Sequence, residues 1–163
     1  MRGGTARADG SPPDPYRSRP STPSEREVRM LAKDIMGRVK APKKNASCRD
    51  VAMKLLSDEY SSLPVVDDDG FVVGIISEFD ILKAVRSGKK LDDVTAGDIM
   101  THSPLCVDVD MSVEKLIDVM TDKHLLRVPV VRDGKLVGSI SRSNIMDSII
   151  SHEFKESFWV LRD

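Results

Sequence analysis

The most constraining feature of this 163-residue chain is that one half of it repeats the other. Asp-Ile-Met occurs at residues 34–36 and again at 98–100, and Pro-Val-Val occurs at 64–66 and 129–131. Seven further pairs recur at the same spacing of 64 or 65 residues: Ser47 and Ser112, Gly70 and Gly134, Val73 and Val137, Gly74 and Gly138, Ile76 and Ile140, Ser77 and Ser141, and Ile81 and Ile145. Composition alone would produce about three matches. The chain is therefore expected to fold as two copies of one unit.

Each copy has the same predicted order of elements. An extended piece (about 38–42 or 105–109) precedes a helix with Ser47 or Ser112 as its N-cap. In the second copy, the apolar residues of this helix fall mostly on one face: Val113, Leu116, Ile117, Met120 and Leu125. A buried strand (63–67 or 128–132), a turn containing Gly70 or Gly134, a second strand (71–77 or 135–141) and a last helix (78–87 or 142–152) complete the unit.

This β-α-β-β-α order places the chain in the α/β (α+β) class. A unit of about 50 residues is too small to cover both faces of its own sheet and helices. We therefore expect two copies, at residues 28–90 and 91–152, to cover each other about a pseudo-twofold axis. Such symmetry leaves two related clefts between the copies.

The two ends of the chain differ from the repeats. Residues 1–27 contain no Val, Ile or Leu, and five of the nine prolines lie between residues 12 and 23. This composition predicts a disordered leader. The C-terminal tail, residues 153–163, carries Phe154, Phe158 and Trp159, for which we expect a dimer or partner surface.

Composition excludes several functions. The 25 basic and 26 acidic side chains nearly balance, which is not typical of a nucleic-acid-binding protein. No apolar run reaches the roughly 20 residues of a membrane helix, and no apolar h-region indicates a secretory signal. Cys48 and Cys106 form neither a disulfide framework nor a metal motif, which predicts a reducing cytoplasm.

Catalytic and metal motifs are also missing from the sequence. His102, His124 and His152 lack metal-ligand spacing with the cysteines or with each other. We find no P-loop, no HExxH and no set of nucleophile, base and orienting residue. The sequence therefore predicts no metal site and no enzyme activity.

The ordered set of motifs resembles the cystathionine β-synthase (CBS) domain, and its tandem occurrence is similar to a Bateman module. The resemblance spans about residues 30–152 and is carried by both Asp-Ile-Met motifs, Leu63-Pro64-Val65-Val66, Val128-Pro129-Val130-Val131, and the segments Gly74–Ile81 and Gly138–Ile145. It implies clefts that often bind AMP, ADP, ATP or S-adenosylmethionine. It also implies a regulatory role, a homodimer, and a partner protein that the sequence does not identify. No other cofactor is expected.

Ser77 and Asp80 are candidates for the first cleft, where a strand becomes a helix. Their spacing also suits a capping box, in which each residue bonds to the backbone of the other. In a ligand site, the helix N-terminus and the Ser77 hydroxyl would bind phosphate, and the Asp80 carboxylate would accept from ribose hydroxyls. The resemblance further implies that Arg127 reaches the ligand's phosphates across the cleft from Asp80. The alternative for Arg127 is an exposed arginine near a helix end.

The second cleft departs from the family pattern. Ser141 and Asn144 repeat the spacing of Ser77 and Asp80, but an amide accepts through only one oxygen. We therefore expect weaker recognition of a ribose diol and unequal clefts. Ser143 and Arg142 could bind phosphate in compensation, although Arg142 also suits a solvated helix position. Tyr60, Ser61 and Ser62 would line this cleft, with Tyr60 either stacked on adenine or part of the core.

Backbone groups complete the predicted sites. The resemblance implies that Val39 and Lys40, or Val107 and Asp108, offer their backbone to the purine edge. Four nearby basic side chains, Arg38, Lys40, Lys43 and Lys44, suit a solvated face or the attraction of polyphosphate. Two other functions remain open: a ligand-free interaction scaffold, and a small enzyme that acts on its nucleotide.

Overall fold

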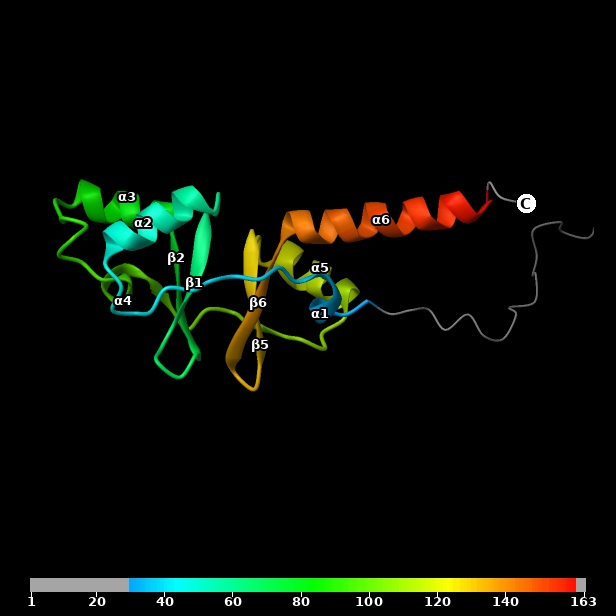
Figure 1. Cartoon of the computed structure of the whole chain (residues 1–163), viewed down its shortest axis with the longest axis horizontal. Helices are drawn as coiled ribbons and strands as arrows, with labels where there is room; N and C mark the ends of the chain where they lie inside the picture. The colour runs from blue at the N-terminus through cyan, green and yellow to red at the C-terminus, as the bar shows by residue number, and fades with distance from the viewer. Residues whose placement is uncertain (1–29, 161–163) are drawn as a thin grey trace, which may run out of the picture.

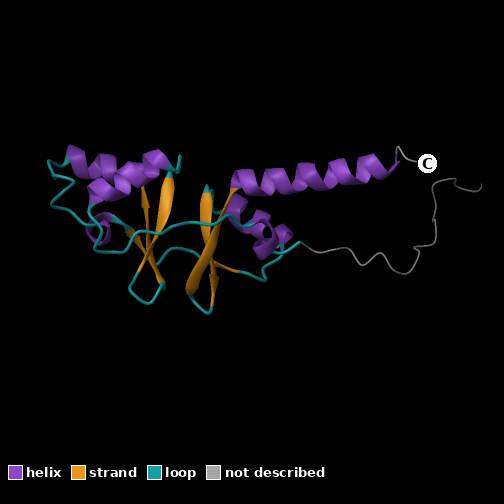
Figure 2. Ribbon diagram, viewed as in Figure 1, coloured by secondary structure: helices purple, strands orange, loops and turns teal. Residues whose placement is uncertain are grey.

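The computed structural model describes residues 30–160, with side chains described through residue 151. Two three-stranded sheets stand side by side in the middle of the molecule, as Figure 2 shows. The first sheet contains β1 (Ser62–Val66), β2 (Val72–Ser77) and β3 (Thr101–His102), and the second contains β4 (Val107–Asp108), β5 (Arg127–Arg132) and β6 (Lys135–Ser141). This architecture confirms the predicted α/β class and the two related units.

The helices of both repeats lie around these sheets. They are α1 (Ala32–Ile35), α2 (Cys48–Ser57), α3 (Glu78–Arg86), α4 (Ala96–Ile99), α5 (Val113–Asp122) and α6 (Arg142–Val160). Figure 1 shows α2, α3 and α6 along one edge of the molecule and the turns of the two hairpins at the opposite edge. Within residues 30–160, each helix is too short or too polar to cross a membrane.

The long helices and the paired strands match their predicted positions closely. Ser47 caps α2 by accepting a hydrogen bond from the Asp50 amide at 3.1 Å. Gly70 and Gly134 have φ values of 89° and 78°, the left-handed conformation that a glycine adopts without strain. The piece at 38–42 leads into an isolated parallel bridge between Lys43 and Val66 and forms no longer strand. The prediction is wrong for the end of α6, which extends past residue 152, and it misses α1, α4 and β3.

Some predictions fall outside what can be seen. Residues 1–29, which include the predicted leader, lie outside the described part of the chain. The side chains of Phe154, Phe158 and Trp159 also lie outside it. Their predicted roles stay predictions.

Each repeat has its own core, and each core is completed by a segment from the other repeat. α1 opens the first repeat, but Ala32 is fully buried in the core of the second, and Ile35 and Met36 pack against that core. α4 opens the second repeat, but Ala96 and Met100 are buried in the core of the first. β3 follows α4 and pairs with β2 of the first repeat. The two repeats therefore exchange their leading segments.

The exchange explains why methionine and glycine recur together in the two motifs. A Cβ atom at Gly74 would lie 2.3 Å from Met100 Sδ, and one at Gly138 would lie 2.9 Å from Met36 Sδ. The methionine of each Asp-Ile-Met motif thus packs on the glycine of the other repeat. The close approach requires that glycine.

The two hairpin turns also meet each other. The Leu136 amide donates to the Gly70 carbonyl at 3.0 Å, and Phe71 and Lys135 form an isolated antiparallel bridge. Lys135 Nζ lies 5.4 Å from the centre of the Phe71 ring. The repeats are therefore tied together at the edge opposite the helices.

Candidate functional site

The turn between β2 and α3 holds Ser77 and Asp80 in a complete capping box. Asp80 Oδ2 accepts from the Ser77 amide at 2.9 Å and from the Ser77 hydroxyl at 2.6 Å, and the Asp80 amide donates to Ser77 Oγ at 3.3 Å. The other carboxylate oxygen, Oδ1, pairs with Lys83 at 3.0 Å. This geometry confirms the capping interpretation and leaves the ligand interpretation as a prediction.

Asp80 remains ionised in this environment although it is only 7% exposed. Burial by itself would raise the pKa of its carboxyl, but the hydrogen bonds from Ser77 and the contact with Lys83 outweigh burial and hold the pKa below its ordinary value. The turn therefore presents a fixed negative charge at the start of α3, where the helix dipole favours it.

Arg127, at the start of β5, lies against the first repeat. Its guanidinium carbon is 4.4 Å from the centre of the Tyr60 ring, and its Nη1 donates to Ser139 Oγ at 3.0 Å. Burial lowers the pKa of Arg127 from its ordinary value, and Tyr60 opposes part of that shift. Within the described side chains, no carboxylate forms an ion pair with this half-buried guanidinium.

The structure differs here from the predicted arrangement of the two clefts. Arg127 and Tyr60, which the sequence predicts in different clefts, contact each other. Tyr60 is partly buried and also packs against the first core, and its hydroxyl lies 3.5 Å from the Arg38 carbonyl. Asp80 is held by Ser77 and Lys83, and no described hydrogen bond joins it to Arg127. A side chain at the seam between the repeats, such as that of Arg127, can pack against either repeat. The position of a residue within its own repeat does not reveal which of the two it contacts.

The turn between β6 and α6 repeats the cap without the charge. Asn144 Oδ1 accepts from the Ser141 amide at 2.8 Å and from the Ser141 hydroxyl at 2.7 Å. Ser143 Oγ lies 2.7 Å from Ser141 Oγ and is exposed to solvent. Arg142 Nε donates to the Leu125 carbonyl at 2.8 Å. This hydrogen bond holds the Arg142 side chain, at the start of α6, against the loop that follows α5.

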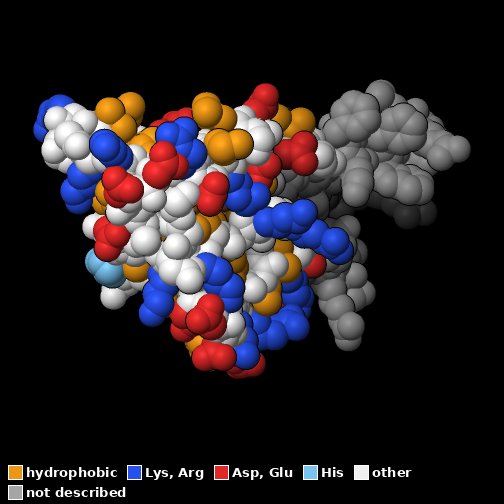
Figure 3. Space-filling model, turned by 60° about the vertical axis from the view of Figure 1, so that its left-hand side comes forward, with side chains coloured by type: hydrophobic (Ala, Val, Ile, Leu, Met, Phe, Trp, Pro, Cys, Tyr) orange, Lys and Arg blue, Asp and Glu red, His pale blue; other side chains and the backbone are white. Residues whose placement is uncertain are grey.

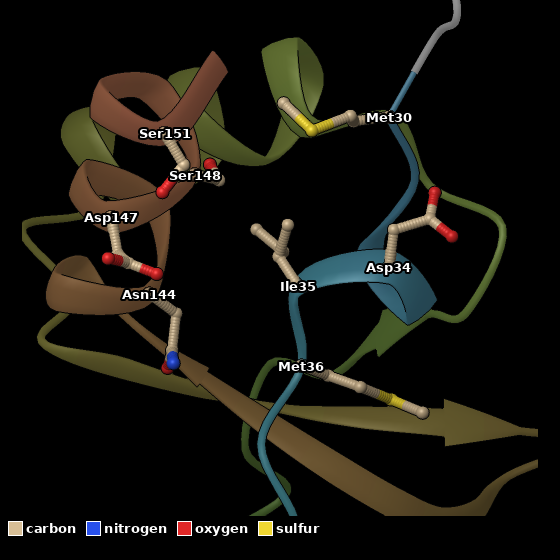
Figure 4. Close-up of a pocket in the computed structure, with 8 residues that line it drawn as sticks. All are labelled: Met30, Asp34, Ile35, Met36, Asn144, Asp147, Ser148 and Ser151. Carbon is tan, nitrogen blue, oxygen red and sulfur yellow. The ribbon is translucent and has the colours of Figure 1, made fainter. Parts of the chain in front are cut away.

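A hollow of about 300 Å³ lies beside this second turn, between α1 and α6. Figure 4 shows Asn144, Asp147, Ser148 and Ser151 along one side of α6, with Ile35 facing them across the hollow. Its size is at the lower limit of small-molecule sites. The sequence favours the first turn, with Asp80, Ser77 and Arg127, as the better site, and that preference stays a prediction.

The remaining predicted residues are dispersed around the seam. Ser61 is exposed and Ser62 half-buried at the start of β1, while Val39 is half-buried against the first core and Lys40 is exposed. Val107 is 1% exposed within the second core, and it pairs with Val130 of β5. Asp108 is exposed and lines a separate hollow with Leu31 and Lys115.

Sequence reasoning missed several residues that the structure adds. Lys83 lies three residues after Asp80, one helical turn away, and this spacing could have indicated the ion pair. Ser139 lies two residues before Ser141 and therefore on the same face of β6. Asp147, Ser148 and Ser151 follow Asn144 at helical spacing. Such spacings are common in any sequence, so they indicate contacts with a site only after the site has been located.

Metal-binding and nucleophilic groups are not concentrated at either turn. Within the described residues, no group of three or more His, Cys, Asp or Glu side chains is placed to hold a metal ion. Burial raises the pKa of both thiols, Cys48 and Cys106, so neither is activated as a thiolate.

Comparison with known proteins assigns the family. The model of the CBS domain matches residues 32–87 and 96–151. The chain belongs to the CBS domain family. One relative, the uncharacterized protein MK0525 of Methanopyrus kandleri, is 35% identical over 99 residues, which is 60% of this chain and 50% of that protein. This chain thus spans about half the length of that curated relative.

Two solved structures of CBS pairs are similar to this chain along nearly their whole length. CBSX2, a protein of Arabidopsis thaliana whose structure is in complex with AMP, is 28% identical with a TM-score of 0.66, and the match covers 76% of this chain and 98% of that one. The CBS domain pair of protein MJ0100, in complex with 5-methylthioadenosine and S-adenosyl-L-methionine, is 29% identical with a TM-score of 0.66 at the same coverage. Similar CBS pairs therefore bind adenosine-containing ligands.

Proposed function

We propose that this chain is a regulatory module that binds an adenosine-containing ligand, AMP, ADP, ATP or S-adenosylmethionine, between its two CBS repeats. The observation that carries the proposal is the state of Arg127. The half-buried guanidinium of Arg127 lies at the seam of the repeats, and among the described side chains no carboxylate pairs with it. Burial of an unpaired charge is costly, and an incoming phosphate would supply charge-assisted hydrogen bonds. The AMP bound by CBSX2 carries such a phosphate, whereas the two ligands of MJ0100 share with it only the adenosine part.

The Arg127–Tyr60 contact suggests how binding is transmitted. Because Arg127 belongs to the second repeat and Tyr60 to the first, their stacking links the repeats. A ligand phosphate that recruits Arg127 weakens that link and frees the Tyr60 ring to stack on adenine. The relative placement of the repeats then shifts by as much as the ligand prefers one arrangement. A partner protein or a second copy of the chain reads this change, and the chain itself performs no catalysis.

Thermal unfolding against a panel of ligands tests the proposal. The panel contains AMP, ADP, ATP, S-adenosylmethionine, NAD and cyclic dinucleotides. A ligand at a hundred times its dissociation constant adds about 2.7 kcal/mol to the stability of the folded state. For a folded region of this size, the midpoint rises on the order of 10 °C.

Two variants on the same strand make the test specific. Arg127→Ala should shrink the shift, whereas Arg132→Ala, an exposed arginine at the other end of β5, should leave it unchanged. The absence of a shift with every ligand would favour the ligand-free scaffold. Turnover of a bound nucleotide would favour the enzyme.

A further inference from the structure

Asp80, in the turn that begins α3, has little capacity left to accept hydrogen bonds. A carboxylate offers about four acceptor positions, divided between its two oxygens. Oδ2 of Asp80 already accepts from the Ser77 amide at 2.9 Å and from the Ser77 hydroxyl at 2.6 Å. Oδ1 pairs with the Lys83 ammonium at 3.0 Å. The remaining acceptor position therefore belongs to the oxygen that Lys83 contacts.

Two neighbouring side chains hold the Lys83 ammonium in this position. Its Nζ lies 3.0 Å from Asp80 Oδ1 and 5.0 Å from the centre of the Phe79 ring, which attracts a cation over its face. Phe79 is itself 67% exposed. Figure 3 shows exposed hydrophobic side chains next to charged side chains on the side of the molecule where Figure 1 places α2 and α3. We call the Lys83 ammonium, held between the Asp80 carboxylate and the Phe79 ring, the Lys83 latch.

The equivalent turn at the start of α6 is built without these groups. Ser143 and Asp147 stand where the latch has its aromatic ring and its ammonium, so this turn has neither the ring nor the cation. Asn144 Oδ1 accepts from both the amide and the hydroxyl of Ser141, which fills the two positions of its one acceptor oxygen. The latch is therefore particular to the turn that carries the carboxylate.

We propose that a ligand with ribose hydroxyls must displace the Lys83 latch from Asp80, so that Lys83 sets the affinity of the first cleft. The inference rests on the proposed function and on recognition of the ribose by Asp80. A diol that donates two hydrogen bonds needs two acceptor positions, and Oδ1 offers both only after the ammonium has left it. The Lys83 side chain is 52% exposed, so it can move into solvent.

The latch lowers the apparent affinity for a ribose-bearing ligand. Only the molecules in which Asp80 Oδ1 is free are competent to bind the diol, and the apparent affinity falls in proportion to their fraction. An ion pair with a half-exposed lysine is weak, so this fraction is about one fifth. A ligand without ribose hydroxyls does not use Oδ1, and its affinity is independent of the latch.

Isothermal titration calorimetry of the full chain with two probes measures this effect. The probes are AMP and 2′,3′-dideoxyadenosine 5′-monophosphate, which lacks both ribose hydroxyls. Lys83→Met removes the ammonium and should tighten AMP about three- to sixfold relative to the dideoxy nucleotide. Phe79→Leu removes only the ring and should give a smaller gain in the same direction. Lys83→Arg keeps a cation and should preserve the wild-type ratio of the two dissociation constants.

Lys33→Met is the matched control for loss of a lysine. Lys33 pairs with Asp110 at 2.6 Å and is 42% exposed, but it lies on α1, which packs against the second repeat. The control should leave the ratio of the two dissociation constants unchanged. The ratio also cancels any general effect of a lost positive charge on phosphate binding, because both probes carry the same phosphate. An unchanged ratio in Lys83→Met, or an equal change in Lys33→Met, overturns the latch.

The result is distinguishable from the outcome for the proposed function. Circular dichroism melting checks that each variant folds. If the wild type binds AMP and Lys83→Met leaves the ratio unchanged, the latch is overturned and the ligand proposal stands. If neither the wild type nor Lys83→Met binds AMP, the latch is overturned, and the proposed function fails with it when the whole ligand panel also gives no thermal shift.

Discussion

The turns that begin α3 and α6 share a serine but cap with different acceptors, the carboxylate of Asp80 in one and the amide of Asn144 in the other. Asp80 accepts from the Ser77 amide and hydroxyl at 2.9 and 2.6 Å, and Asn144 accepts from the Ser141 amide and hydroxyl at 2.8 and 2.7 Å. The cap is therefore made equally well by a carboxylate and by an amide oxygen. Folding of this turn requires an acceptor and not a charge, so the negative charge of Asp80 is available for another purpose.

The largest difference between the repeats is expected at the two motif glycines. At Gly138, a Cβ atom would lie 2.9 Å from the Gly37 carbonyl, which is fixed by its hydrogen bond from the Ser139 amide at 3.0 Å. At Gly74, the nearest atom is the Met100 sulfur at 2.3 Å, the end of a flexible side chain, and the nearest backbone atom is the Thr101 carbonyl oxygen at 3.0 Å. We expect each of Gly138→Ala and Gly74→Ala to destabilise the fold by about 1 to 3 kcal/mol, with the larger loss at Gly138, where the closer backbone contact cannot be relieved by a side-chain movement.

Chemical denaturation measures this difference. Gly37→Ala is the matched control, because its Cβ atom would meet only the Ser139 carbonyl at 3.9 Å. Equal losses at Gly74 and Gly138 would show that the methionine is held as rigidly as the backbone, and the proposed difference between the repeats would then be wrong.

The next effect concerns the charge of Asp80. Asp80→Asn reproduces the second turn in the first, so we expect the unliganded midpoint to change little, since only the pair with the exposed Lys83 and the helix-dipole contact are lost, together under about 1 kcal/mol. The ligand-induced thermal shift should shrink. Asn144→Asp is the reciprocal variant and should increase any shift that arises from the second cleft.

Asp80→Ala provides the contrast, because it removes the cap as well as the charge. We expect it to lower the unliganded midpoint by the equivalent of about 1 kcal/mol. An Asp80→Asn variant that binds ligand as the wild type does would show that the carboxylate serves only the cap.

The same residue predicts a dependence on pH. The pKa of Asp80 is lower in the folded chain than in the unfolded chain, because the hydrogen bonds from Ser77 and Lys83 outweigh burial. The unfolded state therefore binds more protons near the ordinary value of about 3.9, and the stability from Asp80 is present above that pH and lost as the pH falls through the folded pKa. The difference in unfolding free energy between wild type and Asp80→Asn should shrink below about pH 4, and a constant difference would contradict this.

The smallest expected effect is the coupling between Arg127 and Tyr60. A double-mutant cycle with Arg127→Ala and Tyr60→Leu should give a coupling free energy of about 0.5 to 1 kcal/mol. The equivalent positions are Ser62 and Leu125, and a control cycle there should give no coupling, because this pair has neither a cation nor an aromatic ring. Equal coupling free energies in the two cycles would show that the stacking of Arg127 on Tyr60 contributes nothing specific, which would contradict the prediction.

Much of the fold can be predicted from the sequence because its signals are local. Ser47 caps α2 because a serine side chain reaches an amide three residues away, and Gly70 turns the hairpin through its own φ angle. The Ser77–Asp80 cap has the same origin. The contact of Arg127 with Tyr60 and the hollow between α1 and α6 could not be predicted, because each joins segments that are distant in sequence.

The sequence by itself determined that this chain contains two similar units, the order of their elements, and the residues that cap and turn them. Only the tertiary structure decided that α1 completes the second core and α4 the first, and that each Asp-Ile-Met motif packs on the glycine of the other repeat. The physical reason is that hydrogen-bonded caps and turns are specified within a few residues. Burial of apolar surface has no direction along the chain, so either repeat could have received either segment until the whole molecule was packed.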